Sequence, residues 1–454
     1  MSLTAIILAA GHGKRMHSAV PKTLHPLLGQ PLVFYAIQAA EALADTPPIV
    51  VVGHGAQAVQ EAIHARFGDE LAFALQTEQL GTGHAVQAAQ SLAEGRGSQV
   101  LITFGDMPLL RRESLEELLK LHQSSGAVLT MTSVVGDVPR GAGRVLRGSD
   151  STVRAIVEEA VATPMQLAIN EYNVSAYCIE AAWLWPALGR IQPSPKGEYY
   201  LTDLVEIAVK EGRKVQSYVL ADADEGQGIN TRVDLADAEA ALRKRINHQW
   251  MLDGVTLLDP ATITIEPGVI LETDVTLYPG THLRGKTRVG KGSSIGPDST
   301  LFDTVVGQDC TVSYSVAEGA TLGNHVSMGP FCHLRKGAVL QDHVHLGNFG
   351  EVKDSVLGEG VKMGHFSYIG NAKVGKNVNI SAGVITCNYD GKLKHPTEIG
   401  DDAFVGSDTM LVAPVKIGDR ARTGAGSVVT HDVPDDVLVI GVPARLRERK
   451  DQSE

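Results

Sequence analysis

Residues 265–301 read IEPGVILETDVTLYPGTHLRGKTRVGKGSSIGPDSTL, and an aliphatic side chain stands at every sixth position of this stretch. The repeating positions are Ile265, Leu271, Leu277, Leu283, Val289, Ile295 and Leu301, and after one five-residue step they resume at Val306 and Val312 and then at Leu322, Met328, Leu334, Leu340, Leu346 and Val352. A helix repeats every 3.6 residues and a strand every two, whereas a six-residue repeat is typical of a parallel β-helix. This pattern therefore decides the fold of nearly half the chain.

A β-helix built from this repeat is a prism of stacked coils. Three six-residue rungs make a coil of about 18 residues, and successive coils stack about 4.8 Å apart. We expect about ten coils between residues 251 and 440, with the aliphatic side chains pointing inward as columns. We expect glycine and asparagine at the corners, because both residues tolerate tight turns.

One step of the repeat, after residue 352, is five residues long, so the affected coil is shorter. The shorter coil stacks His365 near Asn348 of the coil below and near Ala382 of the coil above, and Tyr368 near Glu351. A lone histidine at a β-helix corner is commonly only a polar turn residue. This histidine is grouped with a tyrosine, a lysine and a loop, so we treat it as a candidate catalytic residue.

The repeat breaks strongly once, between Ile385 and Ile399, where residues 386–397 read TCNYDGKLKHPT. This run interrupts the regular rungs, so we expect a loop ejected from the prism. Ejected loops of solenoid proteins commonly carry function. The loop and His365 therefore mark the place in the prism where we expect a site.

The first 227 residues alternate short apolar strands with helical stretches. The expected strands are Ala5–Leu8, Pro48–Val52 and Val100–Phe104, and the expected helices are Leu32–Ala44, Ala56–Phe67 and His84–Ala93. Such alternation predicts an α/β Rossmann-like domain, in which helices cover both faces of a mostly parallel sheet. Ligands bind outside the carboxyl ends of such strands, and each of these three strands runs into a turn that contains glycine.

The two patterns divide the chain into three parts. Residues 1–227 form the α/β domain, and residues 251–454 form the β-helix. Residues 228–250 link the two parts. Most of this linker reads as one helix, because an apolar stripe runs along it through Leu235, Ala238, Leu242 and Ile246.

The bulk composition excludes several classes of protein. The net charge of −12 argues against a general nucleic-acid or anionic-membrane binder, because both need a positive face. The four cysteines lie far apart and form no CxxC pair, so we expect neither a disulfide scaffold nor a zinc site. The apolar start, Ala5–Ala10, has no preceding basic segment and is too short to span a bilayer. We expect a cytoplasmic protein.

A glycine-rich turn follows the first strand, in the sequence LAAGHGKRM at residues 8–16. Such a turn exposes backbone N–H groups to phosphate oxygens, and Arg15 and Lys22 add two cations nearby. Glycine turns of this kind are often only structural, but the two cations favour triphosphate binding. Asp106, directly after the third strand, has a similar structural alternative as a helix cap, and the glycine turn favours a metal-binding role for it.

Several motifs together resemble known enzymes. Gly-x-Gly-x-Arg-Met followed by Pro-Lys in residues 11–22, Gln76 with the segment 79–85, and Phe104-Gly105-Asp106 resemble the sugar-1-phosphate nucleotidyltransferases. The prism adds Thr386-Cys387-Asn388-Tyr389-Asp390-Gly391, and with it the whole chain resembles the bifunctional GlmU family. These bacterial enzymes make UDP-N-acetylglucosamine, a precursor of peptidoglycan and lipopolysaccharide. The resemblance implies a left-handed β-helix of hexapeptide repeats.

The resemblance assigns uridylyl transfer to the N-terminal domain. The residues that it implies for UTP and UDP-N-acetylglucosamine are Leu8, Ala9, Ala10, Gly11, Lys22, Gln76, Gly81, Thr82, Phe104, Gly105, Asp106, Gly143, Glu158, Asn173 and Asn230, with Gly143, Glu158 and Asn173 on the sugar. Asp106 and Asn230 would hold Mg²⁺, which prefers oxygen ligands. Arg15 and Lys22 would act as catalytic cations. The attacking sugar phosphate is already ionised, so the chemistry needs placement and charge neutralisation rather than a general base.

The resemblance assigns acetyl transfer to the prism, with His365 as the general base. The attacking sugar amine must lose a proton as it attacks the thioester, and imidazole titrates in a suitable range. The implied substrate-binding residues are Arg335, Lys353, Tyr368, Asn379 and Lys394, and the implied acetyl-CoA-binding residues are Ala382, Asn388, Tyr389, Ser407, Ala425 and Arg445. A backbone N–H near Ala382 would donate to the oxyanion.

One position departs from the family's pattern. A family arginine near the C-terminus helps to hold CoA, and glycine replaces it here in the sequence VIGVPAR at residues 439–445. Arg445 is the candidate that takes over this contact. Prisms of this family are generally trimeric, with each acetyl site shared between neighbours, so we also expect a homotrimer.

Two alternatives to a bifunctional enzyme stay open at this point. A nucleotidyltransferase with one activity would use the prism only as an oligomerising or regulatory platform, and His365 and the ejected loop argue against it. A subunit of a larger complex would have decayed sites, and the intact Arg15, Lys22, Asp106 and Asn230 argue against that. The leading hypothesis is acetylation of glucosamine-1-phosphate by acetyl-CoA in the prism. The product is then coupled to UTP in the N-terminal domain, with release of pyrophosphate.

Overall fold

The computed structural model describes residues 2–136, 142–159 and 162–447. The chain forms two compact units, Met1–Leu242 and Arg243–Glu454. Helix α9 (Arg232–Leu252) covers the predicted linker helix, and Ala238 and Leu242 of its apolar stripe are buried. The finer division at residues 227 and 250 stays a prediction. Among the helices of the described residues, none is both long and apolar enough to cross a membrane.

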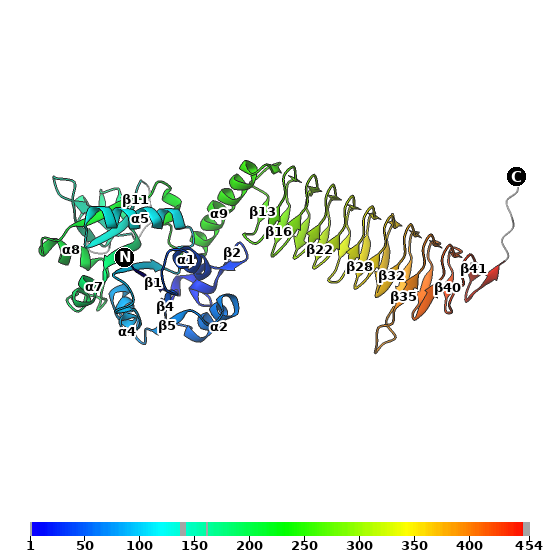
Figure 1. Ribbon diagram of the computed structural model, residues 1–454, viewed down its shortest axis with the longest axis horizontal. Helices are drawn as coiled ribbons and strands as arrows, with labels where there is room; N and C mark the ends of the chain where they lie inside the picture. The colour runs from blue at the N-terminus through cyan, green and yellow to red at the C-terminus, as the bar shows by residue number, and fades with distance from the viewer. Residues whose placement is uncertain (1, 137–141, 160–161, 448–454) are drawn as a thin grey trace. The chain divides into compact units, whose positions relative to one another are not determined.

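The first unit is built on one sheet with the strand order β11-β7-β10-β6-β1-β4-β5, of which Figure 1 labels β11, β1, β4 and β5. The sheet is mostly parallel, as predicted, and its strands are β1 (Leu3–Leu8), β4 (Ile49–Val52), β5 (Ala72–Leu75), β6 (Gln99–Phe104), β7 (Leu129–Val135), β10 (Glu171–Glu180) and β11 (Val215–Val219). Strand β10 alone in this order runs antiparallel to both of its neighbours, β6 and β7. A hairpin of β8 (Arg144–Arg147) and β9 (Val153–Val157) pairs with β10.

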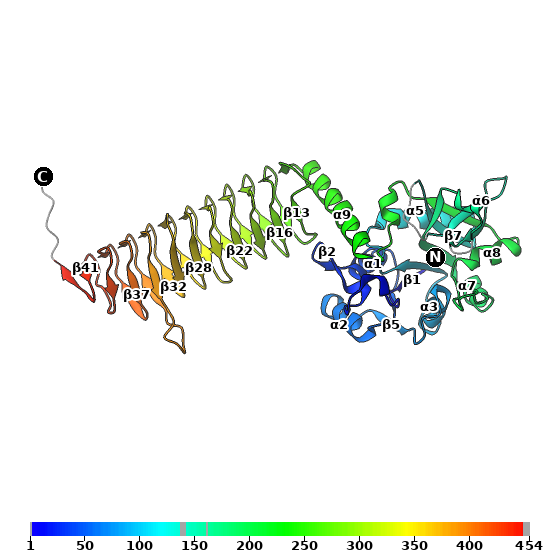
Figure 2. The ribbon, with the colours of Figure 1, turned by 180° about the vertical axis from the view of Figure 1, so that it is seen from behind.

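Helices cover both faces of this sheet. Successive residues of a strand point to opposite faces, so apolar strands such as these need helices to bury both faces. Ile7 and Val50 pack in one cluster with α1 (Leu32–Glu41), α2 (Ala56–Phe67) and α5 (Arg112–Ser125). Ile6 and Val51 pack in another with α3 (Thr82–Ala88), α7 (Ala181–Leu188) and α8 (Asp203–Lys210), and Figure 2 shows these elements from behind. The single helix predicted over His84–Ala93 is two helices, α3 and α4 (Gln90–Ala93), separated at Ala89.

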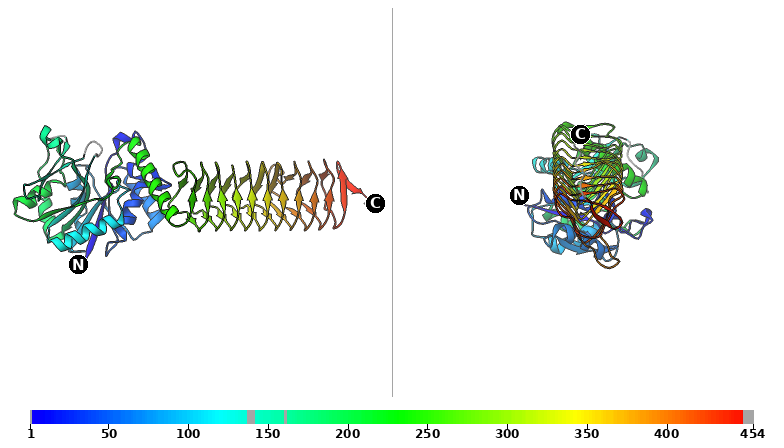
Figure 3. Two further views of the ribbon diagram at one scale, coloured as in Figure 1. Left: turned by 90° about the horizontal axis from the view of Figure 1, so that it is seen from above. Right: turned by 90° about the vertical axis from the view of Figure 1, so that its right-hand side faces the viewer.

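The second unit is the predicted prism of stacked coils. Its strands run from β12 (Thr256–Leu257) to β42 (Ala444–Arg447) and form three sheets, in which nearly every strand pairs in parallel with the strand three places later in the chain. The left view of Figure 3 shows the coils stacked one after another along the prism. All fifteen aliphatic positions from Ile265 to Val352 are at most 7% exposed, so the six-residue repeat forms the core of the prism. The last pair, β41 (Leu438–Gly441) and β42, is antiparallel.

The corners of the prism differ in one respect from the prediction. Glycine is present as expected, for example Gly285 with a φ of 64°. Aspartate is more frequent than asparagine among the non-glycine residues with positive φ, as at Asp298 and Asp303. Its carboxylate also bonds to the neighbouring coil, because Asp303 Oδ1 accepts from the backbone N–H of Lys286 at 2.8 Å. The side chain thus stabilises the turn and the stacking together.

The predicted ejected loop lies between β34 (Ile385–Cys387) and β35 (Thr397–Ile399), and it projects from the prism in Figure 1. Strand pairing resumes after the loop, because β35 pairs with β32 (Ala372–Val374) of the preceding coil. The loop is therefore an insertion into an otherwise continuous coil.

Candidate active sites

The glycine-rich turn after β1 brings Lys22 against the end of β6. Gly13 has a φ of 59°, and a Cβ at this residue would lie 2.6 Å from Lys22 Cβ, so the turn requires glycine here. The Lys22 ammonium forms an ion pair with Asp106 Oδ2, and it also donates to Asn230 Oδ1 at 3.2 Å. The side chains of Lys22 and Asp106 are only 11% and 21% exposed. Three predicted residues thus meet in one partly buried cluster.

The cluster of Asp106 and Asn230 is suited to a small hard cation. The backbone holds both residues, because Ile229 N–H donates to the Asp106 carbonyl at 2.9 Å and Asn230 N–H donates to Asp234 Oδ2 at 2.9 Å. Among residues 2–136, 142–159 and 162–447, no group of three or more His, Cys, Asp or Glu could hold a metal ion. Two oxygen ligands fit Mg²⁺, which usually keeps several waters and binds through one or two carboxylates and substrate phosphates. The Lys22 ammonium lies where such a cation would neutralise Asp106.

A cavity of about 470 Å³ opens beside this cluster. Eight predicted residues line it, namely Arg15, Thr82, Phe104, Asp106, Gly143, Glu158, Asn173 and Asn230. The predicted residues outside this lining are Leu8, Ala9, Ala10, Gly11, Lys22, Gln76, Gly81 and Gly105. The lining also contains residues that the sequence analysis missed, among them Tyr177, Tyr200 and Thr202.

Two polar residues of the cavity are held by residues that were missed. Thr202 Oγ1 donates to Glu158 Oε1 at 3.1 Å, and Asn173 Nδ2 donates to the Tyr177 hydroxyl at 2.7 Å. Burial raises the pKa of Glu158, while the hydrogen bond from Thr202 acts in the opposite direction. Asn173 and Tyr177 lie on one strand, β10, but no sequence motif marks Tyr177.

The predicted uridine segment forms a compact turn. Gln76 is buried, and its Nε2 donates to the Gly81 carbonyl at 3.1 Å. Gly81 has a φ of 103°, and a Cβ there would lie 2.6 Å from the Tyr199 carbonyl. Thr82 Oγ1 accepts from Leu201 N–H at 2.9 Å. The segment is thus held against the 199–201 stretch.

In the prism, the predicted stacking of the short coil is confirmed where the strands pair. Glu351 in β28 (Gly350–Lys353) pairs with Tyr368 in β31 (Ser367–Gly370). The same offset separates Asn348 from His365. The His365 side chain is exposed, and among the described residues none forms a hydrogen bond or ion pair with it.

Several predicted acetyl-site residues share one corner of successive coils with His365. Gly383 N–H donates to the Phe366 carbonyl at 2.7 Å, which stacks Ala382 over His365. Asp408 N–H donates to the Ala382 carbonyl at 2.7 Å, and Gly426 N–H donates to the Ser407 carbonyl at 2.8 Å. His365, Ala382, Ser407 and Ala425 therefore form one column along the prism.

Three predicted cations, Arg335, Lys353 and Lys394, lie close to one another. The adjacent Lys394 ammonium lowers the pKa of Lys353, and the charge of Arg335 adds to the effect. Arg335 Nη1 donates to Glu351 Oε1 at 3.0 Å, and Glu351 is the residue that pairs with Tyr368. Like charges this close favour an anionic ligand, such as a phosphate. Asn379, also predicted here, donates to Ser381 Oγ at 3.2 Å.

The ejected loop has its own internal structure, which holds Lys394 and Tyr389 in place. Tyr389 and Lys394 form an antiparallel bridge. Asp390 closes the turn, accepting from His395 Nε2, Lys392 N–H and Leu393 N–H, each at 2.7 Å. These bonds, the one from His395 first, lower the pKa of Asp390. At the base of the loop, Asn388 Nδ2 donates to Asn371 Oδ1 at 2.6 Å.

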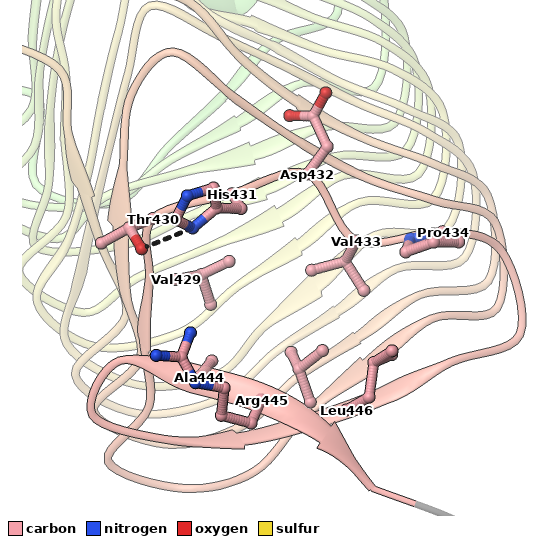
Figure 4. Close-up of a pocket in the computed structure, with 10 residues that line it drawn as sticks. Val429, Thr430, His431, Asp432, Val433, Pro434, Ala444, Arg445 and Leu446 are labelled. Atoms are coloured by element: carbon pink, nitrogen blue, oxygen red, sulfur yellow. Dashed lines mark hydrogen bonds between the residues drawn. The ribbon is translucent and has the colours of Figure 1, made fainter.

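Arg445 lies at the C-terminal end of the prism, beside a cavity of about 640 Å³. Figure 4 shows its side chain extending from β42 toward the strand that carries Val429, with the Thr430–His431 hydrogen bond nearby. Thr423 in β39 (Arg422–Thr423) pairs with Val439, so Gly441 follows Ala425 in the corner column. Arg445 pairs with Ile440, next to that glycine. The role of Arg445 in binding CoA stays a prediction.

Two family models match the chain. Residues 5–171 match the MobA-like NTP transferase domain, and residues 396–431 match the Bacterial transferase hexapeptide (six repeats). Together with the observed sheets, these matches confirm the predicted fold, a Rossmann-like nucleotidyltransferase domain followed by a left-handed β-helix.

Known proteins resemble the chain over its whole length. Bifunctional protein GlmU of Exiguobacterium sp. strain AT1b is 43% identical over 455 residues, covering 100% of this chain and 99% of the relative. Bifunctional protein GlmU of Heliobacterium modesticaldum is 44% identical over 438 residues, covering 96% of this chain and 95% of the relative. A solved structure of UDP-glucose pyrophosphorylase complexed with UDP-glucose covers 54% of this chain and 100% of its own, at 17% identity and a TM-score of 0.44. A likeness as weak as this last one supports no conclusion.

Proposed function

The chain belongs to the bifunctional GlmU family, and from that premise we propose that it makes UDP-N-acetylglucosamine in two steps. Acetyl-CoA acetylates glucosamine-1-phosphate in the prism, and UTP then reacts with N-acetylglucosamine-1-phosphate in the N-terminal unit, releasing pyrophosphate. One observation carries this proposal: the identity of 43% extends from end to end and spans both halves, each of which holds a candidate site. Both co-substrates are cytoplasmic metabolites, which supports a cytoplasmic location.

The N-terminal site has the charges that uridylyl transfer needs. The sugar phosphate attacks the α-phosphate of UTP, and Arg15 and Lys22 stabilise the negative charge that builds up on the phosphates. Asp106 and Asn230 would hold Mg²⁺, which adds further neutralisation when bound. Because Lys22 is bonded to both residues, its ammonium would have to leave them for Asp106 and Asn230 to hold the metal. We infer that Lys22 then moves to the phosphates.

The prism holds a candidate base and a candidate anion-binding cluster of cations. His365 takes a proton from the sugar amine as the amine attacks the acetyl thioester, and thiolate leaves. Arg335, Lys353 and Lys394 would bind the sugar phosphate, and the repulsion among them is relieved by a dianion. Acetyl-CoA would lie along the column of Ala382, Ser407 and Ala425, with Asn388 and Tyr389 at the loop. These roles are proposals that the column geometry supports.

An exposed aromatic column supports assembly into a trimer. Tyr314, Phe331, Phe349 and Phe366 occupy equivalent corners of successive coils and are 43%, 57%, 57% and 55% exposed. The Phe331 ring stacks on that of Phe349, with centroids 5.4 Å apart, and it packs at a tilt against the Tyr314 ring, with centroids 5.8 Å apart. A contiguous apolar row of this kind is typical of a surface that another chain covers. Because the row ends beside His365, a neighbouring subunit there would share the acetyl site. A monomer by light scattering would contradict the shared site.

One assay tests the proposed function. The chain is incubated with glucosamine-1-phosphate, acetyl-CoA, UTP and Mg²⁺, and UDP-N-acetylglucosamine is measured while each component is omitted in turn. Product should require all four. Product that forms from N-acetylglucosamine-1-phosphate but never from glucosamine-1-phosphate would instead favour a nucleotidyltransferase with one activity.

A further inference from the structure

We propose that Tyr177 is a positioning residue for sugar recognition, which anchors one end of the Asn173 carboxamide so that the other end meets the substrate sugar. The inference rests on the proposed uridylyl transfer, because it assigns a partner to a residue of the sugar pocket. Tyr177 itself need not touch the substrate. It acts through Asn173.

The contact is direct and enclosed. Asn173 Nδ2 donates to the Tyr177 hydroxyl at 2.7 Å, and the two residues are only 7% and 1% exposed. Burial raises the pKa of Tyr177, so the phenol stays protonated at neutral pH. Both residues line the same cavity as Asp106 and Asn230. A hydrogen bond closed off from water in this way fixes the side chain that makes it.

The backbone of β10 produces this contact. Strand residues four apart share a face, and the pairing of β10 with β7 shifts register between Asn173 and Tyr177, as a bulge does. Asn173 is held further by its N–H, which donates to the Gly143 carbonyl at 2.8 Å. Bulges next to active sites commonly re-aim a side chain. This one aims Tyr177 at the Asn173 carboxamide.

Within the part of the chain that the structure describes, the other end of the carboxamide has no partner. Asn173 Oδ1 is buried and unpaired among the described residues. Buried polar atoms without a partner are uncommon, and such an atom in a ligand cavity gains most from a ligand that supplies the missing hydrogen bond. The ligand must therefore bring an O–H or N–H donor to this point, as a neutral sugar ring with hydroxyl and acetamido groups does.

The test is a double-mutant cycle in the full chain, with steady-state uridylyl transfer as the readout. Tyr177→Phe keeps the ring and removes the hydroxyl. We expect it to raise the KM for N-acetylglucosamine-1-phosphate by about 5- to 20-fold while the KM for UTP changes less than about twofold. In an Asn173→Ala background, Tyr177→Phe should have no further effect on this KM, because the residue through which it acts is gone.

The control is Tyr35→Phe, which removes a hydroxyl that donates to the Leu27 carbonyl at 2.6 Å and does not line the cavity. It should leave both KM values unchanged. A Tyr177→Phe effect that is equal in the wild-type and Asn173→Ala backgrounds, or equal for sugar phosphate and UTP, would overturn the proposal.

A second variant covers the case in which Tyr177→Phe does not fold. Asn173→Gln keeps the amide and moves its free end by one methylene, so the KM for the sugar phosphate should rise at least about fivefold. An unchanged KM would also overturn the proposal. Absence of uridylyl transfer in the unmodified chain would instead contradict the proposed function, which keeps the two failures distinct.

Discussion

Replacing Lys22 with methionine removes a charge that the structure places against both candidate metal ligands. Its ammonium is bonded to Asp106 and, at 3.2 Å, to Asn230, and only 11% of the side chain is exposed. Methionine has a similar shape, so Lys22→Met deletes the charge with little change in packing. Two consequences follow, one for catalysis and one for stability.

The loss of activity can be estimated from the number of contacts. Removal of one preorganised donor from a site that stabilises developing charge costs about 10²–10³ in rate.

Asp106 is 21% exposed and loses its cation, which costs about 1–3 kcal/mol of unfolding free energy. For a unit of this size that lowers the thermal midpoint by roughly 2–12 °C. Mg²⁺ without nucleotide should raise the thermal midpoint of Lys22→Met more than that of the wild type, because in the variant no ammonium competes for Asp106 and Asn230.

The assays are the two half-reactions, run separately on the same protein, and thermal unfolding with and without Mg²⁺. Acetyl transfer from acetyl-CoA should stay within about twofold, because Lys22 lies in the other unit. Lys210→Met is the matched control, because Lys210 is 71% exposed and its ion pair with Glu206 lies on the surface. Equal losses in both half-reactions, or a loss of uridylyl transfer below about tenfold, would refute the reasoning.

Three further predictions concern charge and packing. Lys394 is the main cause of the lowered pKa of Lys353, so Lys394→Gln should raise the pKa of Lys353. In binding titrations at increasing pH, the variant should therefore begin to lose affinity for glucosamine-1-phosphate at a higher pH than the wild type. Burial raises the pKa of Glu158, so the stability of the wild type falls as pH rises from the ordinary glutamate pKa of about 4.3 toward neutrality. The thermal midpoint of Glu158→Gln should therefore rise relative to that of the wild type over this pH interval. A difference in thermal midpoint that does not change with pH would contradict this prediction. Leu346 is fully buried in the prism, so Leu346→Ala should cost about 2–5 kcal/mol in urea unfolding, against little for a change at exposed Leu393.

The repeat predicted the prism because one physical requirement acts on each coil in the same way. Every coil must fill the same interior space, so Leu277, Leu283 and Ile295 recur at one spacing and are all fully buried. The five-residue step had a definite consequence as well, since it fixes which residue of the next coil pairs with Glu351. Local rules of this kind can be read from the chain.

The parts that sequence did not reveal depend on contacts between distant segments. Lys22 and Asp106 were both identified as candidates, but only the folded chain shows that they form an ion pair. Tyr177 was missed because the bulge in β10 and the antiparallel direction of that strand arise from its pairing with β6 and β7. Arg445 was identified, but its place beside Gly441 depends on a terminal hairpin.

The central claim is that one chain carries two separate sites, and that the product of the first site reaches the second by diffusion. Lys22→Met and His365→Ala are each incubated with glucosamine-1-phosphate, acetyl-CoA, UTP and Mg²⁺, first alone and then mixed, and UDP-N-acetylglucosamine is measured. Each variant alone should form little product, while the mixture should recover synthesis, because N-acetylglucosamine-1-phosphate made by one variant is used by the other. A mixture as inactive as its components, or a His365→Ala variant that still makes product from glucosamine-1-phosphate, would contradict the account.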